Sequence, residues 1–189
     1  MNLQTALHRV SKDCPQWVIE QIVLIKVPFI DFKLQDNFGY LLVHKNLEND
    51  LKIIFQKLYQ IQFPIYSIIP MSDSKFWNDK HWCDNLSMRL NNSTCFNYRT
   101  IAGKTKLSTH ALGMAIDINP MQNPYICKKT ILPKNGSYQI NQIGTFSNNN
   151  KAIKIFENRG FFWGGNFSTM KDYHHFEKKV KGFEQYFQD

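Results

Sequence analysis

The chain has 189 residues with 43% apolar and 20% charged side chains, which fits one globular domain, or one domain with an appendage, and argues against a disordered chain. Lysine and arginine number 23 and aspartate and glutamate 15, so the formal charge is +8, which favours an anionic partner. The longest apolar runs fall short of the about 18 residues of a membrane span, and the composition also excludes a collagen, a coiled coil and a disulfide mini-protein.

Residues 1–45 mix apolar clusters with the breakers Pro15, Pro28 and Gly39, which predicts short helical or strand pieces. We interpret residues 1–38 as an N-terminal extension packed on a main domain of residues 39–189, and as a possible docking surface for a partner. The first residues lack the apolar stretch of a signal peptide, so the sequence indicates no export route and leaves the localisation open.

The central elements follow from hydrophobic periodicity. Residues 46–63 carry apolar side chains at helical spacing, which predicts an amphipathic helix that ends before Pro64, and residues 65–69 read as a strand. Residues 72–94 are polar and predict a long surface loop, which carries Trp77 and Trp82. A strand is expected over residues 95–101.

In residues 114–119 apolar and polar positions alternate, which predicts a half-buried strand with Asp117 on its exposed face. Residues 148–159 predict a helix with Gly160 as its cap, and residues 161–163 and 173–177 predict strands joined through Gly164 and Gly165. This order predicts an α+β fold, a single domain with a small antiparallel sheet flanked by helices.

The scattered lysines form only short clusters, and no DNA- or RNA-binding motif is present, so we expect a solvated basic face and no nucleic-acid partner. The four cysteines lack a CxxC spacing and allow three pairings. A bridge between Cys83 and Cys95 and four reduced thiols are both compatible with the sequence. A thiol hydrolase built on Cys95 or Cys127 is disfavoured.

Two segments offer the ligands of a catalytic zinc ion. One runs from Ser108 to Asp117 and includes His110, and the other runs from Trp163 to Glu177 and includes His174 and His175. Two histidines and one aspartate make the three-ligand set that leaves one zinc position open. An unbroken strand would put His110 and Asp117 on opposite faces, but Gly113 permits a turn or bulge that lets them converge.

Strand alternation favours one of the two adjacent histidines. His174 shares a face with Phe176, and His175 shares the other face with Tyr173 and Glu177. If Phe176 packs inward, His175 reaches the site. Tyr173 and His174 line the pocket or pack, and the sequence leaves that choice open.

These segments resemble the zinc D-alanyl-D-alanine carboxypeptidase family, in its VanY-like and phage L-alanyl-D-glutamate endopeptidase branch. The family pattern SxHxxGxAxD is matched between Ser108 and Asp117, the pattern WGG…DYxHFE between Trp163 and Glu177, and the FNYR segment by residues 96–99. The likeness runs from about Gly39 to Glu177. It implies a Hedgehog/DD-peptidase-like fold.

The resemblance also implies roles for individual residues. His110, Asp117 and His175 would hold Zn²⁺, Asp172 would be the catalytic carboxylate, and Arg99 would steady the substrate carbonyl oxygen. Ser108 would orient the first loop. Arg99 as a surface ion-pair partner and Asp172 as a loop cap are the alternative interpretations.

The implied function is a zinc metallopeptidase that hydrolyses a peptidoglycan stem peptide by attack of zinc-bound water, and so acts on the cell envelope. The L-Ala–D-Glu bond and the terminal D-Ala–D-Ala bond are both compatible with the motifs. The alternatives are a non-catalytic cell-wall-binding or signalling module that keeps the zinc fold, and an interaction protein that docks a partner through residues 1–38.

Overall fold

The computed structural model describes residues 1–79, 81–101, 103–148 and 150–187. Short helices and small sheets alternate along the chain, which confirms the α+β prediction. None of the described helices is long and apolar enough to cross a membrane.

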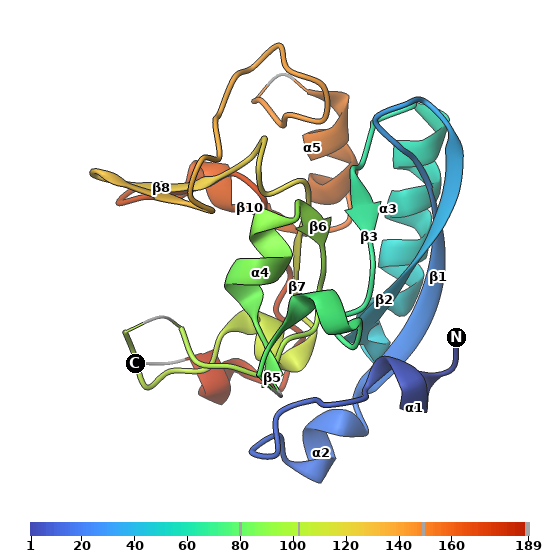
Figure 1. Ribbon diagram of the computed structural model, residues 1–189, viewed down its shortest axis with the longest axis vertical. Coiled ribbons are helices and arrows are strands. Elements are labelled where there is room, and N and C mark those ends of the chain that lie inside the picture. Colours follow the sequence, from blue (N-terminus) through green and yellow to red (C-terminus); the bar gives the residue numbers. More distant parts are fainter. Residues whose placement is uncertain (80, 102, 149, 188–189) are drawn as a thin grey trace.

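A long β-hairpin and one helix build the first half of the core. After the short helices α1 (Leu3–Ala6) and α2 (Gln16–Ile19), β1 (Ile22–Ile30) pairs antiparallel with β2 (Asp36–His44) over nine residues each. Helix α3 (Glu48–Gln60) follows the short 3₁₀ turn at 45–47 and lies against this hairpin (Figure 1). The expected helix at 46–63 is therefore confirmed, with shorter ends. The side chains that it buries are Leu51, Ile54, Phe55 and Leu58.

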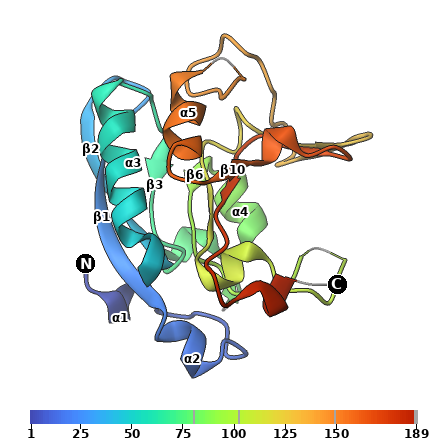
Figure 2. The same cartoon turned by 180° about the vertical axis from the view of Figure 1, so that it is seen from behind.

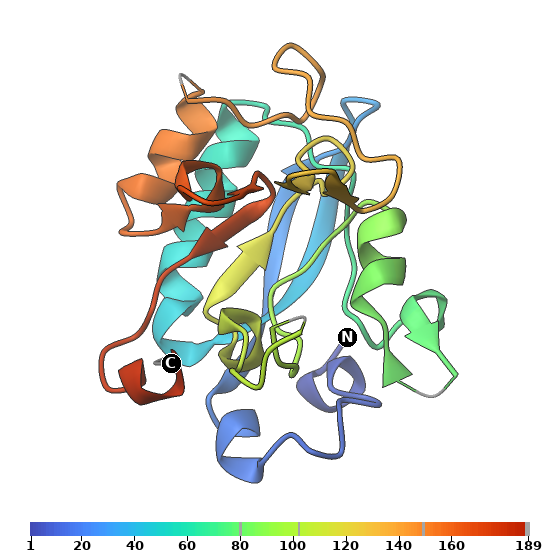
Figure 3. The same cartoon turned by 90° about the vertical axis from the view of Figure 1, so that its left-hand side faces the viewer.

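A three-stranded antiparallel sheet lies at the centre. Its order is β10 (Phe162–Trp163), β12 (His175–Glu177) and β7 (Ala115–Asp117). Figure 3 shows β7 and β12 side by side in front of the hairpin. Helix α5 (Lys151–Glu157) packs against α3 and the sheet (Figure 2), and aromatic rings of Phe146, Phe156 and Phe176 fill the space between them.

A second three-stranded sheet projects from the body of the molecule (Figure 1). Strand β8 (Tyr125–Cys127) pairs with β9 (Thr130–Leu132) on one side and with β11 (Lys171–Asp172) on the other. This sheet, which we call the wing, presents Asp172 next to the central sheet because β11 leads directly into β12.

The prediction of a long surface loop at 72–94 is wrong. The segment contains a 3₁₀ turn at 74–76, strands β4 (Trp77–Asn78) and β5 (His81–Trp82), helix α4 (Asp84–Arg89) and β6 (Asn92–Ser93). Strand β6 pairs in parallel with β3 (Ser67–Ile68), which lies within the strand expected at 65–69. The polar composition misleads because a few large side chains, above all Phe76, anchor the segment in the interior.

The strand expected at 95–101 is also absent. The backbone N–H of Phe96 donates to the carbonyl of Leu42, whereas that of Asn97 donates to the carbonyl of His110. These hydrogen bonds reach two different neighbours, β2 and the turn after Ser108, so no strand ladder forms along the segment.

The strand at 114–119 is shorter than expected, and its polar face is not exposed. Only residues 115–117 form β7, and Asp117 is 3% exposed. The helix expected at 148–159 is confirmed as the shorter α5, and Gly160 follows it with a left-handed φ of 78°. All four cysteines are free thiols.

The division into residues 1–38 and 39–189 stays a prediction. Strand β2 begins at Asp36, so its first three residues precede that boundary, and it pairs along its whole length with β1. Ile25 and Val27 of β1 are buried in the same apolar core as Leu58 of α3. The first 20 residues cover one end of this hairpin (Figure 1).

Candidate metal and catalytic site

A capped 3₁₀ turn positions His110. The turn runs from Thr109 to Leu112, and the Ser108 hydroxyl accepts a hydrogen bond from the His110 backbone N–H at 3.3 Å. Gly113 ends the turn with a φ of 64° and redirects the chain into β7. A Cβ atom on Gly113 would lie 2.6 Å from the backbone nitrogen of His44, so only glycine fits here.

Strand register positions Asp117 and His175. The two residues lie directly opposite each other in the β7–β12 pair, so their side chains share one face of the sheet. Phe176 and Ile116 form the next pair, and both side chains are fully buried in the core. Phe176 therefore packs inward as expected, and His175 is the histidine that reaches His110.

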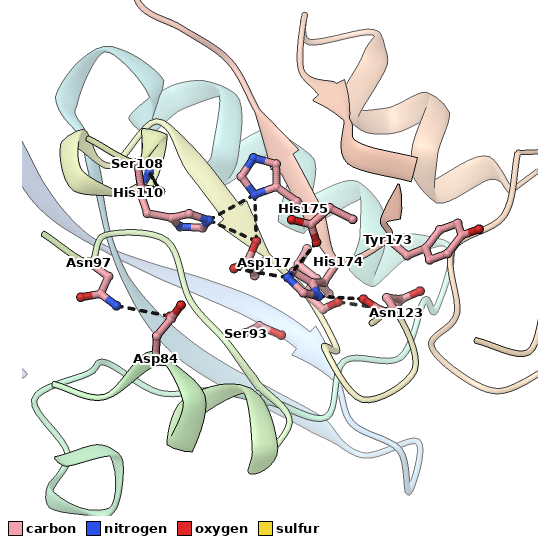
Figure 4. Close-up of polar contacts among 12 residues, drawn as sticks. Asp84, Ser93, Asn97, Ser108, His110, Asp117, Asn123, Tyr173, His174 and His175 are labelled. Atoms are coloured by element: carbon pink, nitrogen blue, oxygen red, sulfur yellow. Dashed lines mark hydrogen bonds and ion pairs between the residues drawn. The ribbon is translucent and has the colours of Figure 1, made fainter. Parts of the chain in front are cut away.

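Three ligand atoms form a nearly equilateral triangle (Figure 4). His110 Nε2 lies 3.2 Å from His175 Nδ1 and 3.2 Å from Asp117 Oδ1, and the last two atoms are 3.1 Å apart. All three side chains are buried. A tetrahedral ion about 2.0 Å from each ligand separates its ligand atoms by about 3.3 Å. The triangle thus has the size that a zinc ion requires.

The outer nitrogen of each histidine faces an oxygen acceptor. His110 Nδ1 lies 2.6 Å from the carbonyl oxygen of Cys95, and His175 Nε2 lies 3.3 Å from Glu177 Oε2. A proton held on each outer nitrogen would leave both inner nitrogens available as ligands when an ion enters the triangle. Histidine ligands of metal ions are held by carboxylate or carbonyl partners in this way.

The electrostatics of the triangle favour a cation. Burial raises the pKa of Asp117, but His110 and His174 outweigh burial and hold it well below its usual range. Burial lowers the pKa of His175, but hydrogen bonds to Asp117 and Glu177 raise it to about 10. The site therefore stabilises positive charge among its ligands, and the donor set of two imidazoles and one carboxylate fits zinc.

His174 is a buried group of the site that the sequence left unassigned. Its Nδ1 lies 2.7 Å from the carbonyl oxygen of Asn123, and its Nε2 lies 3.8 Å from Asp117 Oδ2 (Figure 4). The same Nε2 lies 2.9 Å from Asp172 Oδ1. Burial lowers the pKa of His174, but Asp172 and Asp117 raise it to about 9. The imidazole therefore links Asp172 to the triangle. Alternation places Asp172 and His174 on the same face, since the two are two positions apart, but it gives no signal for the approach of His174 to Asp117.

Arg99 makes an ion pair and also borders the site. Its Nη2 lies 2.8 Å from Asp84 Oδ2, so the side chain does form an ion pair. Both side chains line the same cavity as the triangle. Asp84 begins α4 and lies within residues 72–94, whose polar composition predicts a loop.

A cavity of about 560 Å³ opens over the triangle. Asp172 and Arg99 line it together with the three triangle residues. Apolar walls come from the wing and from the segment before β11, through Tyr125, Leu132, Phe167 and Met170. The cavity thus brings together every site residue that the sequence singled out.

Cys95 does not form a nucleophilic site. Its thiol is buried, and Sγ lies 3.4 Å from the carbonyl oxygen of Gly113. Burial raises its pKa well above the usual value, which suppresses the reactive thiolate.

Comparison with known proteins confirms the family resemblance. Residues 102–178 match the family model described as D-alanyl-D-alanine carboxypeptidase. The matched segment includes the triangle and Asp172, whereas Arg99 and Asp84 lie before it. No curated protein and no solved structure matches the chain. The match supports a hydrolytic peptidase, of a family whose members generally depend on zinc.

Proposed function

We propose that the protein is a zinc metallopeptidase that hydrolyses a peptide bond in the stem peptide of peptidoglycan, on a DD-peptidase-like fold. The observation that carries the proposal is the triangle of His110, Asp117 and His175, with sides of 3.1–3.2 Å, at the base of a cavity that also contains a carboxylate and a guanidinium. These are the groups that metal-assisted hydrolysis of an amide requires.

His110, Asp117 and His175 would hold the zinc ion. A zinc ion bound there supplies a Lewis acid that polarises the scissile carbonyl and increases the acidity of water. Ser108 and Gly113 hold His110 in place, and Glu177 holds His175, so the three ligand atoms are positioned before the ion binds.

Asp172 acts as the general base and then as the general acid. Its carboxylate lies in the cavity on the strand that leads into His175, and His174 fixes one of its oxygens at 2.9 Å. It takes a proton from the attacking water and later gives that proton to the leaving amine. Arg99 donates a hydrogen bond to the substrate carbonyl oxygen as negative charge develops on it, an effect typically of about 2.7–4 kcal/mol.

The test is mass spectrometry of purified stem peptides incubated with zinc-loaded protein. One substrate ends in D-Ala–D-Ala and another contains the L-Ala–D-Glu bond, so the fragment mass identifies the bond. We expect wild-type protein to release a fragment and Asp172→Asn to lose about 10²–10⁴-fold in rate. Glu48→Gln on α3, which removes an exposed carboxylate that pairs with Lys52, is the control and should cleave at the wild-type rate.

Zinc content and far-ultraviolet circular dichroism of each protein separate a catalytic defect from a folding defect. A zinc-loaded, folded wild-type protein that releases no fragment from either substrate would overturn the proposal. That outcome would favour a cell-wall-binding module that keeps the zinc fold.

A further inference from the structure

Asp84 forms an ion pair with Arg99, and both side chains line the cavity. Asp84 Oδ2 lies 2.8 Å from Arg99 Nη2, and Oδ1 accepts a hydrogen bond from Asn97 Nδ2 at 3.3 Å. The side chains of Arg99 and Asp84 are 31% and 23% exposed, so the pair is partly shielded from water. A shielded ion pair of this kind restricts the rotation of a long arginine side chain more than a pair on the open surface.

The backbone around Arg99 does not fix its side chain by itself. Residues 95–99 lie outside the strands and helices. Arg99 Nη1 donates to the neighbouring Thr100 carbonyl at 3.4 Å, and Nε is buried with no hydrogen-bond partner among the described residues. Asp84 is therefore the strongest anchor of the guanidinium.

Asp84 is itself held in place by contacts of the two residues that precede α4. The backbone N–H of Cys83 donates to the carbonyl of Phe76, at 2.7 Å. Trp82 Nε1 donates to the carbonyl of His8 at 2.9 Å, and the Trp82 ring meets Phe96 edge-on. The start of α4 is thus tied both to the first residues of the chain and to the segment that carries Arg99.

We propose that Asp84 is a positioning residue that holds the Arg99 guanidinium toward the substrate carbonyl. This inference rests on the proposed function, because it assigns Asp84 an effect on the reaction through Arg99. A guanidinium that is held in place loses less freedom when charge develops on the carbonyl oxygen, and a misplacement of about 1 Å can lower a rate about 10²-fold. Asp84 lies outside the segment that matches the family model.

A double-mutant cycle on cleavage rates tests the inference. Asp84→Asn keeps the shape of the side chain and removes its charge, and we expect kcat to fall about 10–100-fold with a smaller change in KM. In an Arg99→Ala background the same Asp84→Asn substitution should change kcat less than about twofold, because the group through which it acts is gone. The inference would be overturned if the separate losses in kcat of the two single variants multiply in the double variant. A wild-type kcat for Asp84→Asn would also overturn it.

A second test of the inference uses NMR spectroscopy and does not depend on peptidase activity. Because Arg99 Nε is buried, its N–H should give a protected signal in ¹⁵N-edited NMR spectra, assigned by its loss in Arg99→Lys. We expect Asp84→Asn to shift and broaden this signal, whereas Glu48→Gln, which removes a carboxylate from the exposed pair with Lys52, should leave it unchanged.

The two arms separate this inference from the proposed function. Suppose that wild-type protein cleaves no stem peptide but that Asp84→Asn shifts and broadens the Arg99 signal. Asp84 then restrains Arg99 as inferred, and the proposed peptidase function is wrong. If wild-type protein is active and neither kcat nor the Arg99 signal responds to Asp84→Asn, the function stands and the positioning role is wrong.

Discussion

His110 Nε2 and His175 Nδ1 face each other at 3.2 Å, although 65 positions separate the two residues in the chain. Each ring has an oxygen acceptor at its other nitrogen, so a ring with a single proton keeps it there and turns a lone pair toward its neighbour. Two lone pairs so close together repel unless a proton or a metal ion lies between them. The geometry of this pair is therefore the strongest structural argument that the site binds a cation.

Glu177 should strengthen zinc binding through His175, because its carboxylate accepts the Nε2–H of that ring at 3.3 Å. We expect Glu177→Ala to weaken zinc affinity about 10–100-fold, which competition with a chromophoric chelator measures. Glu177→Gln keeps an acceptor oxygen for the histidine, so it should lose less affinity than Glu177→Ala. Equal zinc affinities in the wild type and Glu177→Ala would contradict this role.

Gly113 is required for two separable reasons, its left-handed φ and its close approach to His44. Gly113→Ala should lower the free energy of unfolding by about 3 kcal/mol or more, since a left-handed alanine costs about 1–2 kcal/mol and overpacking adds about 1–3 kcal/mol. Urea denaturation of the metal-free protein measures the change.

Gly103 provides the matched control for that substitution. It has a similar φ of 75°, but a Cβ atom there would meet nothing within 4 Å. Gly103→Ala should therefore show the conformational cost alone, about 1–2 kcal/mol. If both variants lose the same stability, the contact with His44 does not restrict position 113.

Strand alternation predicted which histidine faces the site, but it did not predict how the site is enclosed. The choice of His175 required only that Phe176 pack inward, which strand alternation and an apolar side chain are enough to predict. The burial of Asp117 was missed because alternation assumes that a polar face meets water. Here the face of β7 that carries Asp117 is covered by the turn that carries His110.

The contacts of His174 and Asp84 could not be predicted in this way. His174 meets Asp117 because β12 pairs with β7, and Asp84 meets Arg99 because two irregular segments cross. Such contacts depend on tertiary placement and leave no periodic signal. The polar sequence of 72–94 concealed α4 for the same reason, since its short elements are held by contacts with distant residues.

His44 should make the metal-free protein less stable in acid. The ring is fully buried, Nδ1 accepts the backbone N–H of Asn46 at 3.1 Å, and Nε2 has no hydrogen-bond partner among the described residues. Burial, with a smaller effect of Lys45, lowers the pKa of His44 from 6.5 to about 4. The unfolded chain therefore binds the proton more readily than the folded protein. The contribution of neutral His44 to the free energy of unfolding is complete above pH 6.5 and is lost as the pH falls toward 4.

His44→Asn tests the acid response, because asparagine can still accept the Asn46 N–H but does not titrate. In chelator, wild-type stability should fall faster than that of the variant between pH 6.5 and 4, by at most about 1.4 kcal/mol per pH unit. Urea denaturation at several pH values measures the difference. Parallel stability curves for the two proteins would show that His44 is not the responsible group.

Strand β1 should be indispensable to the core, although it lies within the expected N-terminal extension. Ile25 is 1% exposed and packs in the main apolar cluster, so Ile25→Ala should lower the free energy of unfolding by about 2–5 kcal/mol. Lys26 is its exposed neighbour, and Lys26→Ala should change stability by less than about 1 kcal/mol, the scale of its cation–π contact with Phe38.

Removal of residues 1–38, which leaves the fragment 39–189, tests whether the whole extension is needed for folding. Without residues 1–38 it lacks β1, which pairs with β2 along nine positions and covers one side of α3. We expect the purified fragment to give a collapsed amide NMR spectrum and no cooperative thermal transition, because its exposed apolar face has no partner. A dispersed spectrum with cooperative unfolding would instead establish residues 39–189 as an independent domain and residues 1–38 as a detachable appendage.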